Sequence, residues 1–420
     1  MAMTIAEKIL SRAADRPTVQ PGDFVWARVD QTNAGAGELR VLDELGIKRL
    51  AAPETVWATS DHYAPATDEH YANQDNRLRQ YVRQYGIRNF FEYGRHGIAH
   101  QLFGEHGAML PGTLSAMSDS HSTSGGVFNC FATPIGSETA FVLATGLLWL
   151  QVPETIRIEL FGTLGPLCYG KDVVLTVLKE LGSEVGIYRA FEFGGSGLRS
   201  LTVASRWTLS NMGIELGAKA AICEHDEVLE AYLRERTTRP YQPVSPDPGC
   251  RYVRHHRIDL DGLPPMVACP DDPTNVHPAS EVADWNVRVS QVFLGSCTNG
   301  RFEDLEVAAR ILRGRRVHPD VRMIVSPASQ GVWREANAQG VLQTLAEAGA
   351  LVSHSTCGPC FGGHLGVLGD GDVCMSSSNR NYRGRMGSAK AAVYLGNAAT
   401  VAAAAVTGRI VDPRSVMQEG

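Results

Sequence analysis

The sequence lacks the features that mark several classes of protein. Its 39 lysines and arginines are outnumbered by 45 aspartates and glutamates, for a formal net charge of −6 at pH 7. Without a basic surplus, nucleic acid is not expected as a main partner. No charged, apolar and small-residue leader opens the chain, and Met1–Lys8 instead predicts the start of an amphipathic helix.

Long uninterrupted apolar runs are also missing. The run 141–152 is too short to span a bilayer, and the alanine-rich run 391–406 is broken by Gly396, Asn397 and Thr400. We expect both runs to form buried helices and expect no membrane contact. Nine cysteines, an odd number, in a chain without a leader argue against secreted disulfides, so we expect a cytoplasmic location. There is no internal repeat of fixed period.

What the chain does have is a regular alternation of β-branched and helical segments. With 420 residues, 44% of them hydrophobic, two or three domains of an α/β class are expected. We predict a helix over 171–181, and strands over 155–160, 291–294, 321–325 and 348–353. The proline-rich segment 236–248 predicts a linker, and a weaker boundary lies near 151–153.

Three cysteines carry most of the information. Cys297 lies in Gly295-Ser296-Cys297-Thr298-Asn299, and the pair Cys357-Gly358-Pro359-Cys360 follows sixty positions later. A site with three thiolates leaves one metal position open for water or substrate. Both segments follow predicted strands, and ligands bind at strand ends in open α/β sheets. The alternatives are a redox dithiol, since Cys-Gly-Pro-Cys occurs in thioredoxins, and zinc or plain structure.

Polar clusters with histidine occupy the first third of the chain. Asp61-His62, His100 and the segment Ser118-Asp119-Ser120-His121 place acids beside imidazoles, the pairing that tunes proton transfer near neutrality. The last of these is equally explained as a helix cap. Asn211 and Glu215 stand four apart, on one face if the segment is helical.

A short arginine-rich segment follows the cysteines. Arg380, Arg383 and Arg385 stand in an otherwise neutral stretch after three serines. Guanidinium groups suit carboxylate recognition, although a solvated basic loop would have the same composition. Binding of a polycarboxylate beside a Lewis-acidic iron would be chemically coherent.

Taken together, these motifs resemble the aconitase superfamily, and most closely the large subunits of 3-isopropylmalate dehydratase and homoaconitase. The Ser-Cys-Thr-Asn, Thr-Cys-Gly-Pro-Cys and Ser-Ser-Asn-Arg-Asn segments occur in the family's order and spacing, and the resemblance covers nearly the whole chain. It implies three α/β/α domains around an iron–sulfur cluster, which we place at 1–160, 161–265 and 266–420. It also implies reversible dehydration and rehydration of a 2-hydroxy polycarboxylate.

The resemblance also assigns roles to residues. It implies one [4Fe–4S] cluster held by Cys297, Cys357 and Cys360 with one iron open to substrate. The implied acid–imidazole pairs are Asp61 with His62, His100 with Asp119, and His121 with Glu215. The implied substrate-binding residues are Asn211, Asn299, Asn379, Arg380 and Arg385.

The sequence departs from the family pattern in three places. Ser118 and Ser122 replace a glycine and a threonine, and Gln31 stands a few positions early for the family's substrate-contacting glutamine. The Tyr-Gly-x-Gly-Ser-Ser-Arg segment of the swivelling domain is absent from the chain. The resemblance therefore implies a separate small subunit that carries the catalytic serine and a further arginine.

Three other functions are alternatives to an iron–sulfur dehydratase of 3-isopropylmalate. The first is a redox protein that uses Cys357 and Cys360 as a dithiol. The second is a non-catalytic iron- or RNA-responsive binding protein, against which the charge balance and the retained Asp119, His121 and Arg380 count. The third keeps the enzyme but changes the substrate from 3-isopropylmalate to homoaconitate or another malate derivative.

Overall fold

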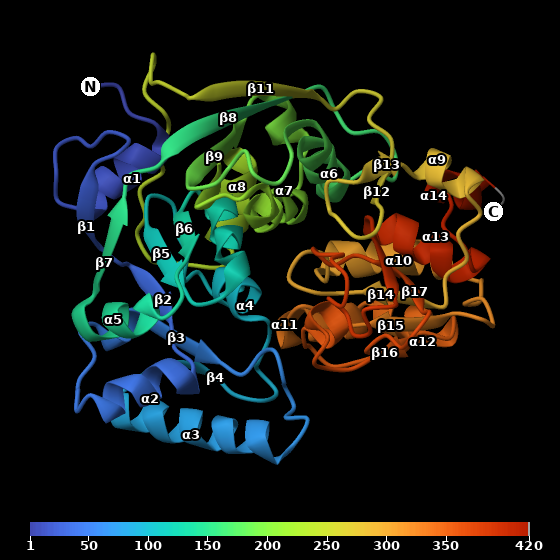
Figure 1. Ribbon diagram of the computed structural model, residues 1–420, viewed down its shortest axis with the longest axis horizontal. Coiled ribbons are helices and arrows are strands. Elements are labelled where there is room, and N and C mark those ends of the chain that lie inside the picture. The colour runs from blue at the N-terminus through green and yellow to red at the C-terminus, as the bar shows by residue number, and fades with distance from the viewer. Residues whose placement is uncertain (419–420) are drawn as a thin grey trace.

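The computed structural model describes residues 1–418 as four β-sheets with helices packed around them (Figure 1). A five-stranded sheet in the order β4-β3-β2-β5-β6 and a four-stranded sheet in the order β10-β9-β8-β11 are both entirely parallel. A seven-stranded sheet, β13-β12-β18-β17-β14-β15-β16, is parallel except where β12 pairs with β13 and β18. The fold class is therefore α/β, as the alternation of segments predicted.

The strands are β1 (Phe24–Arg28), β2 (Gln31–Asn33), β3 (Val56–Thr59), β4 (Asn89–Phe91), β5 (Leu114–Met117), β6 (Phe131–Pro134), β7 (Leu147–Gln151), β8 (Glu154–Phe161), β9 (Arg189–Gly194), β10 (Ala220–Cys223), β11 (Arg254–Asp259), β12 (Met266–Ala268), β13 (Val276–Pro278), β14 (Gln291–Leu294), β15 (Arg322–Val325), β16 (Leu351–Val352), β17 (Val373–Ser376) and β18 (Ala392–Leu395). The helices are α1 (Ile5–Ala13), α2 (Ala36–Glu44), α3 (Glu69–Tyr85), α4 (Ala99–Glu105), α5 (Glu138–Thr145), α6 (Gly170–Leu181), α7 (Val203–Asn211), α8 (Glu227–Arg234), α9 (Ala279–Asp284), α10 (Phe302–Leu312), α11 (Gln330–Ala338), α12 (Val341–Glu347), α13 (Ala398–Thr407) and α14 (Pro413–Gln418).

Most of the predicted elements form. The amphipathic start becomes α1, which begins after Thr4 because the Thr4 hydroxyl accepts from the Glu7 amide and the Glu7 carboxylate accepts from the Thr4 amide. The predicted strands correspond to β8, β14, β15 and β16, the predicted helix corresponds to α6, and the proline-rich segment 236–248 contains no helix or strand.

The prediction that each apolar run forms one buried helix is wrong. In the run 141–152, α5 ends at Gly146, whose φ of +73° is left-handed, and the chain continues as β7, where Trp149 is 54% exposed. In the run 391–406, β18 comes first, and Asn397 then caps α13 by accepting from the Thr400 amide. None of the helices within residues 1–418 is long and apolar enough to cross a membrane.

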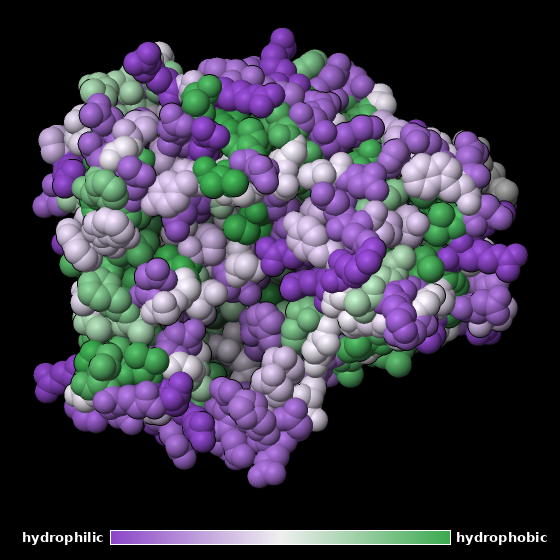
Figure 2. All heavy atoms as spheres, viewed as in Figure 1, coloured by the Kyte–Doolittle hydropathy of each residue, from purple (hydrophilic) through white to green (hydrophobic). Residues whose placement is uncertain are grey.

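The loops that follow β14 and β17 at the carboxyl edge of the seven-stranded sheet contact earlier parts of the chain, since Asn211 reaches Cys297 and Arg380 pairs with Glu215. Strands β14 and β17 pair in parallel and lead into the Cys297 loop and the serine-rich segment 376–378. Figure 2 shows that the face drawn in Figure 1 is hollowed near its middle, beside the C-terminal third of the chain. The three-domain division stays a prediction; β8, which lies almost wholly before its first boundary at residue 160, pairs with β9 and β11 beyond that boundary.

Candidate functional site

The three cysteines of the two motifs lie in short loops beyond the strands, and all three side chains are buried. Cys297 follows β14 directly after Ser296, whose φ of +75° turns the chain sharply. Cys360 belongs to the short 3₁₀ turn Gly358–Phe361, and Cys357 caps that turn. Cys297 and Cys357 pack in one small apolar cluster with Ile98 and Ala328. The two motifs, sixty positions apart in the chain, are thus brought together.

Two asparagine amides reach the cysteine sulfurs. Asn211 Nδ2 lies 3.2 Å from Cys297 Sγ, and Asn379 Nδ2 lies 3.5 Å from the same sulfur. On its other side, Asn379 Oδ1 lies 3.7 Å from Cys360 Sγ. Amide donors aimed at sulfur stabilise the thiolate form, which is the form that ligates metal.

The electrostatic surroundings of the sulfurs differ. Burial raises the pKa of Cys297, but the charges of His100 and His121 outweigh burial and lower it to about 6. Burial raises the pKa of Cys360 to about 11 even though the Arg385 guanidinium acts in the opposite direction. Burial likewise raises the pKa of Cys357. A group that supplies positive charge would therefore be needed to hold Cys357 and Cys360 as thiolates beside Cys297.

The donor set fits a cluster rather than a single ion. Among residues 1–418, no group of three or more His, Cys, Asp or Glu side chains converges closely enough to hold one metal ion. An iron–sulfur cluster binds each thiolate to a different iron, so its ligands stand apart around it. Cys297 and Cys360 share the Asn379 side chain as a neighbour, and Cys357 packs in the same apolar cluster as Cys297, so the three buried thiols meet that requirement.

Asp61, His62, His100 and Asp119 form one acid–imidazole group. His62 Nδ1 lies 2.7 Å from Asp61 Oδ1, and the Asp61 charge raises the pKa of His62 to about 10. Asp119 lies between two rings, 3.5 Å from His100 Nδ1 and 3.6 Å from His62 Nε2. Desolvation raises the pKa of Asp119, but the charges of His100, His62 and His121 together hold it well below its usual range.

His100 is the least satisfied of these side chains. It is fully buried at the start of α4, and neither ring nitrogen has a hydrogen-bond partner within residues 1–418. A buried imidazole with two free nitrogens can exchange a proton with a group placed beside it.

His121, Glu215 and Arg380 form the second group. Glu215 Oε1 lies 3.0 Å from His121 Nε2 and accepts a hydrogen bond from Arg380 Nε at 2.8 Å. Burial raises the pKa of Glu215, and the His121 and Arg380 contacts outweigh burial and lower it. Arg380 also donates to Ser120 Oγ at 3.3 Å. The arginine is therefore tied to the acid–imidazole pair.

Other predicted residues lie nearby in different arrangements. Arg385 lies beside Cys360, and its Nε is buried without a hydrogen-bond partner among residues 1–418. The Asn299 amide donates to Thr208 Oγ1 and to Asp304 Oδ1, while its Oδ1 is unpaired in the described chain. Arg383, by contrast, pairs with Asp271 at the surface and is not part of the group.

A cavity of about 300 Å³ adjoins the first group. It is lined by Asp61, His62 and Asp119 together with Asn33 and Ser118. The Asn33 side chain donates to Ser118 Oγ at 2.9 Å and accepts from the Ser118 amide. Gln31 does not line this cavity, because its side chain is buried against Ser115.

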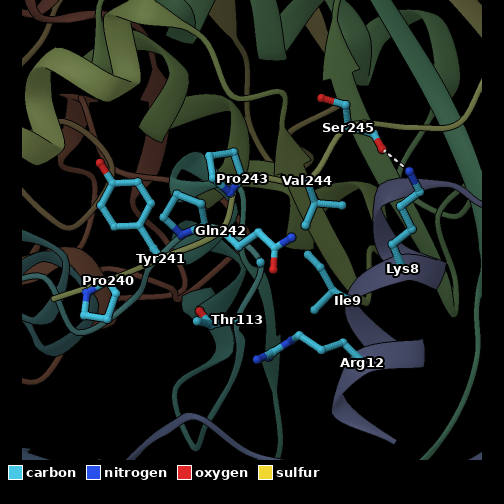
Figure 3. Close-up of a pocket in the computed structure, with 12 residues that line it drawn as sticks. Lys8, Ile9, Arg12, Thr113, Pro240, Tyr241, Gln242, Pro243, Val244 and Ser245 are labelled. Atoms are coloured by element: carbon cyan, nitrogen blue, oxygen red, sulfur yellow. Dashed lines mark hydrogen bonds between the residues drawn. The ribbon is translucent and has the colours of Figure 1, made fainter. Parts of the chain in front are cut away.

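A larger cavity of about 590 Å³ lies elsewhere, between α1 and the segment 240–245 (Figure 3). It contains none of the predicted site residues. Its cations are already engaged, Lys8 by Asp247 and the Ser245 carbonyl and Arg12 by Asp30. Size alone therefore does not identify the functional site.

Sequence reasoning missed Thr298 as a contributor to the cysteine surroundings. Its hydroxyl donates to Asn211 Oδ1 at 2.7 Å and accepts from Asn379 Nδ2 at 2.9 Å, so it orients both amides toward Cys297. Its place next to Cys297 was the available signal. Arg301, whose guanidinium donates to the carbonyls of Cys297 and Thr298, carried no such signal.

Comparisons with known proteins show the family of this chain. The model of the aconitase family (aconitate hydratase) matches residues 38–408. The chain is 41% identical to the 3-isopropylmalate dehydratase large subunit of Aquifex aeolicus, over 100% of this chain and 98% of that protein. It is 43% identical to 3-isopropylmalate dehydratase large subunit 1 of Methanopyrus kandleri, over 99% of each.

A solved structure, holo aconitase X of Thermococcus kodakaraensis, is 11% identical with a TM-score of 0.48 over 84% of each chain. The family match and the full-length relatives, and not this structural likeness, identify the family. They show that the chain belongs to the aconitase family.

Proposed function

We propose that this chain is the large subunit of an iron–sulfur hydro-lyase of the 3-isopropylmalate dehydratase type. The observation that carries the proposal is the convergence of three buried thiols with two acid–imidazole groups. Cys357 packs beside Cys297, and the charge of His100 acts on Cys297. The segment Asn379–Arg380 links Cys297 and Cys360 to the Glu215–His121 pair. The names of the full-length relatives support the same activity and substrate.

Cys297, Cys357 and Cys360 would hold a [4Fe–4S] cluster. When bound, such a cluster supplies a Lewis-acidic iron that polarises a carbon–oxygen bond. Asn211 and Asn379 would favour the thiolate form of Cys297 by donating to its sulfur. The positive charge of the irons would lower the pKa values of Cys357 and Cys360, which burial raises in the chain alone.

The remaining side chains would bind and orient the substrate and move its protons. His62 and His100, which flank Asp119, would give a proton to the departing hydroxyl and take one back on hydration. Arg380 and Arg385 would fix substrate carboxylates through their planar guanidinium groups. A carboxylate that binds Arg380 would compete with Glu215 for the guanidinium group. Glu215 would then be paired with His121 only.

A small subunit is the proposed partner, in keeping with relatives named large subunits. By family resemblance it would contribute a serine that abstracts the substrate proton and an arginine that binds a carboxylate. We propose the same division of this chain into three domains, 1–160, 161–265 and 266–420.

Iron content after reconstitution without oxygen tests the cluster. The wild-type chain should bind about four irons. Cys297→Ser, Cys357→Ser and Cys360→Ser should each lose them. A chain that binds no iron but forms a reducible Cys357–Cys360 disulfide would contradict the proposal and favour a dithiol redox protein.

A further inference from the structure

Lys171 is a fully buried cation at the start of α6. Its ammonium donates to the Ser377 carbonyl at 3.0 Å and to the Ser378 carbonyl at 2.6 Å. The adjacent Asp172 accepts from the Met266 amide at 2.7 Å and from Asn397 Nδ2 at 2.8 Å. The start of α6 is thus fastened to the sheet that carries the cysteine loops.

The two carbonyls belong to a segment that joins both halves of the site. The Ser377 hydroxyl donates to the carbonyls of Gly295 and Asn299, and it accepts from the Gly295 amide, so it holds both ends of the Cys297 loop. Directly after Ser378 come Asn379, which reaches Cys297 Sγ, and Arg380, which pairs with Glu215. A shift of this segment would move all of these contacts together.

The ammonium has no carboxylate partner. Among residues 1–418, no acidic oxygen lies within 4.0 Å of Lys171 Nζ. Burial accordingly lowers the pKa of Lys171 to about 7, while Asp304, Cys297 and Cys360 act in the opposite direction. Burying an unpaired cation is unfavourable by several kcal/mol, and a methionine of similar shape would avoid that penalty. The charge therefore needs an explanation beyond packing.

We propose that Lys171 is a positioning residue for the site. Its ammonium holds the carbonyls of Ser377 and Ser378 so that Asn379 and Arg380 face Cys297 and the substrate. Its positive charge also opposes the negative charge that Cys297 and Cys360 carry as thiolate ligands. This inference rests on the proposed function, since it concerns retention of the proposed cluster and binding of the proposed substrate.

The test compares Lys171→Met with a matched control, Lys219→Met. Lys219 is a half-buried lysine that also donates to a carbonyl, that of Pro134 at 3.3 Å, and it lies outside the site. Each variant is reconstituted without oxygen, and iron release to ferrozine is followed with time. Lys171→Met should release iron about tenfold faster or more, a typical effect of residues that support metal ligands. Lys219→Met should match the wild type.

Kinetics with the small subunit add a second readout. Because Arg380 is displaced in Lys171→Met, KM for the hydroxy acid should rise as well as kcat fall, and Lys171→Arg should recover part of both losses. Folded Lys171→Met with wild-type iron release and wild-type kinetics would overturn the inference. A wild-type chain that binds no iron would instead overturn the proposed function.

If Lys171→Met does not fold, Lys171→Gln takes its place, because a glutamine amide can still donate to carbonyls. Faster iron release from folded Lys171→Gln supports the role of the charge, and release at the wild-type rate overturns it. If Lys171→Gln is also unfolded while Lys171→Arg folds, the ammonium supports the fold rather than the site, and the inference is overturned.

Discussion

Asn379→Asp is the change that probes the surroundings of the cysteines most sharply. The substitution keeps the size of the side chain and replaces its amide with a carboxylate. The two terminal atoms of the Asn379 side chain lie close to sulfur: Nδ2 is 3.5 Å from Cys297 Sγ, and Oδ1 is 3.7 Å from Cys360 Sγ. The amide that donates to the Cys297 sulfur, and accepts from the Cys360 thiol, would thus become an anion that repels both sulfurs as thiolates.

The magnitude follows from these distances. At an effective dielectric constant of about 20, one such pair of like charges repels by about 4 kcal/mol, which corresponds to roughly a thousandfold weaker retention of iron. Asn379→Ala removes the hydrogen bonds and adds no charge, so its loss should be smaller, about 1.5–3 kcal/mol. The difference between these two variants isolates the effect of the charge.

The assay is iron release to a chelator from each variant and the wild type at pH 5.5 and pH 8. The thiolates raise the pKa of the new carboxyl group, so it takes up a proton as the pH falls and the repulsion fades. The deficit of Asn379→Asp relative to the wild type at the same pH should therefore be larger at pH 8. If Asn379→Asp and Asn379→Ala lose iron equally at both pH values, the structure's account of these sulfur contacts is refuted.

Three further predictions address the arginines, the remaining cysteines and the fold. Arg380→Lys should lower turnover about tenfold or more with iron content unchanged, because an ammonium cannot replace the bidentate guanidinium group. The matched variant Arg383→Lys, at the surface, should be as active as the wild type, and equal activity of the two variants would contradict carboxylate binding by Arg380. Cys374→Ser, in β17, should retain its iron, and loss of iron there would indicate a closed four-cysteine site. Burial raises the pKa of Glu192 to about 7, so the folded chain binds this proton more tightly than the unfolded chain does. The contribution of this proton to the free energy of unfolding is present in full below about pH 4.5 and is lost as the pH rises through 7. In Glu192→Gln the amide oxygen can still accept from the Ala6 amide while the NH2 group donates to the Tyr252 oxygen. This variant should therefore gain stability relative to the wild type between pH 5 and pH 8, by at most about 3 kcal/mol in urea unfolding, and an equal difference at both pH values would contradict the shift.

The fold was predictable where local patterns decide structure. The strict alternation of residues 155–160 predicted β8, and the amphipathic pattern of residues 1–8 predicted the start of α1. The apolar run 141–152 was mispredicted because hydrophobicity alone does not distinguish a buried helix from α5 followed by a strand. What makes β7 a strand is its pairing with β1, more than a hundred positions earlier in the chain, which local reasoning cannot see.

The candidate site was predictable where short sequence motifs identify its residues. The cysteines and the Asp–His neighbours are identified by residue type, but their mutual placement depends on the parallel pairing of β14 and β17. Asn299 shows the limit, because its neighbour Asp304 turns the amide away from the sulfurs. Lys171 is a second example, because a lysine in a predicted helix is expected at the surface and only the packing of α6 shows that it is buried.

Turnover in the presence and absence of a partner tests the central claim most directly. The chain, loaded with iron without oxygen, is mixed with 3-isopropylmalate, and the absorbance of the unsaturated acid is followed with and without a cognate small subunit. The proposal predicts no useful rate from the chain alone, and a restored rate with the small subunit that Cys357→Ser abolishes. Full activity from the chain alone would show that the base lies within these 420 residues. No activity with the small subunit present would contradict the assignment as a dehydratase of this substrate.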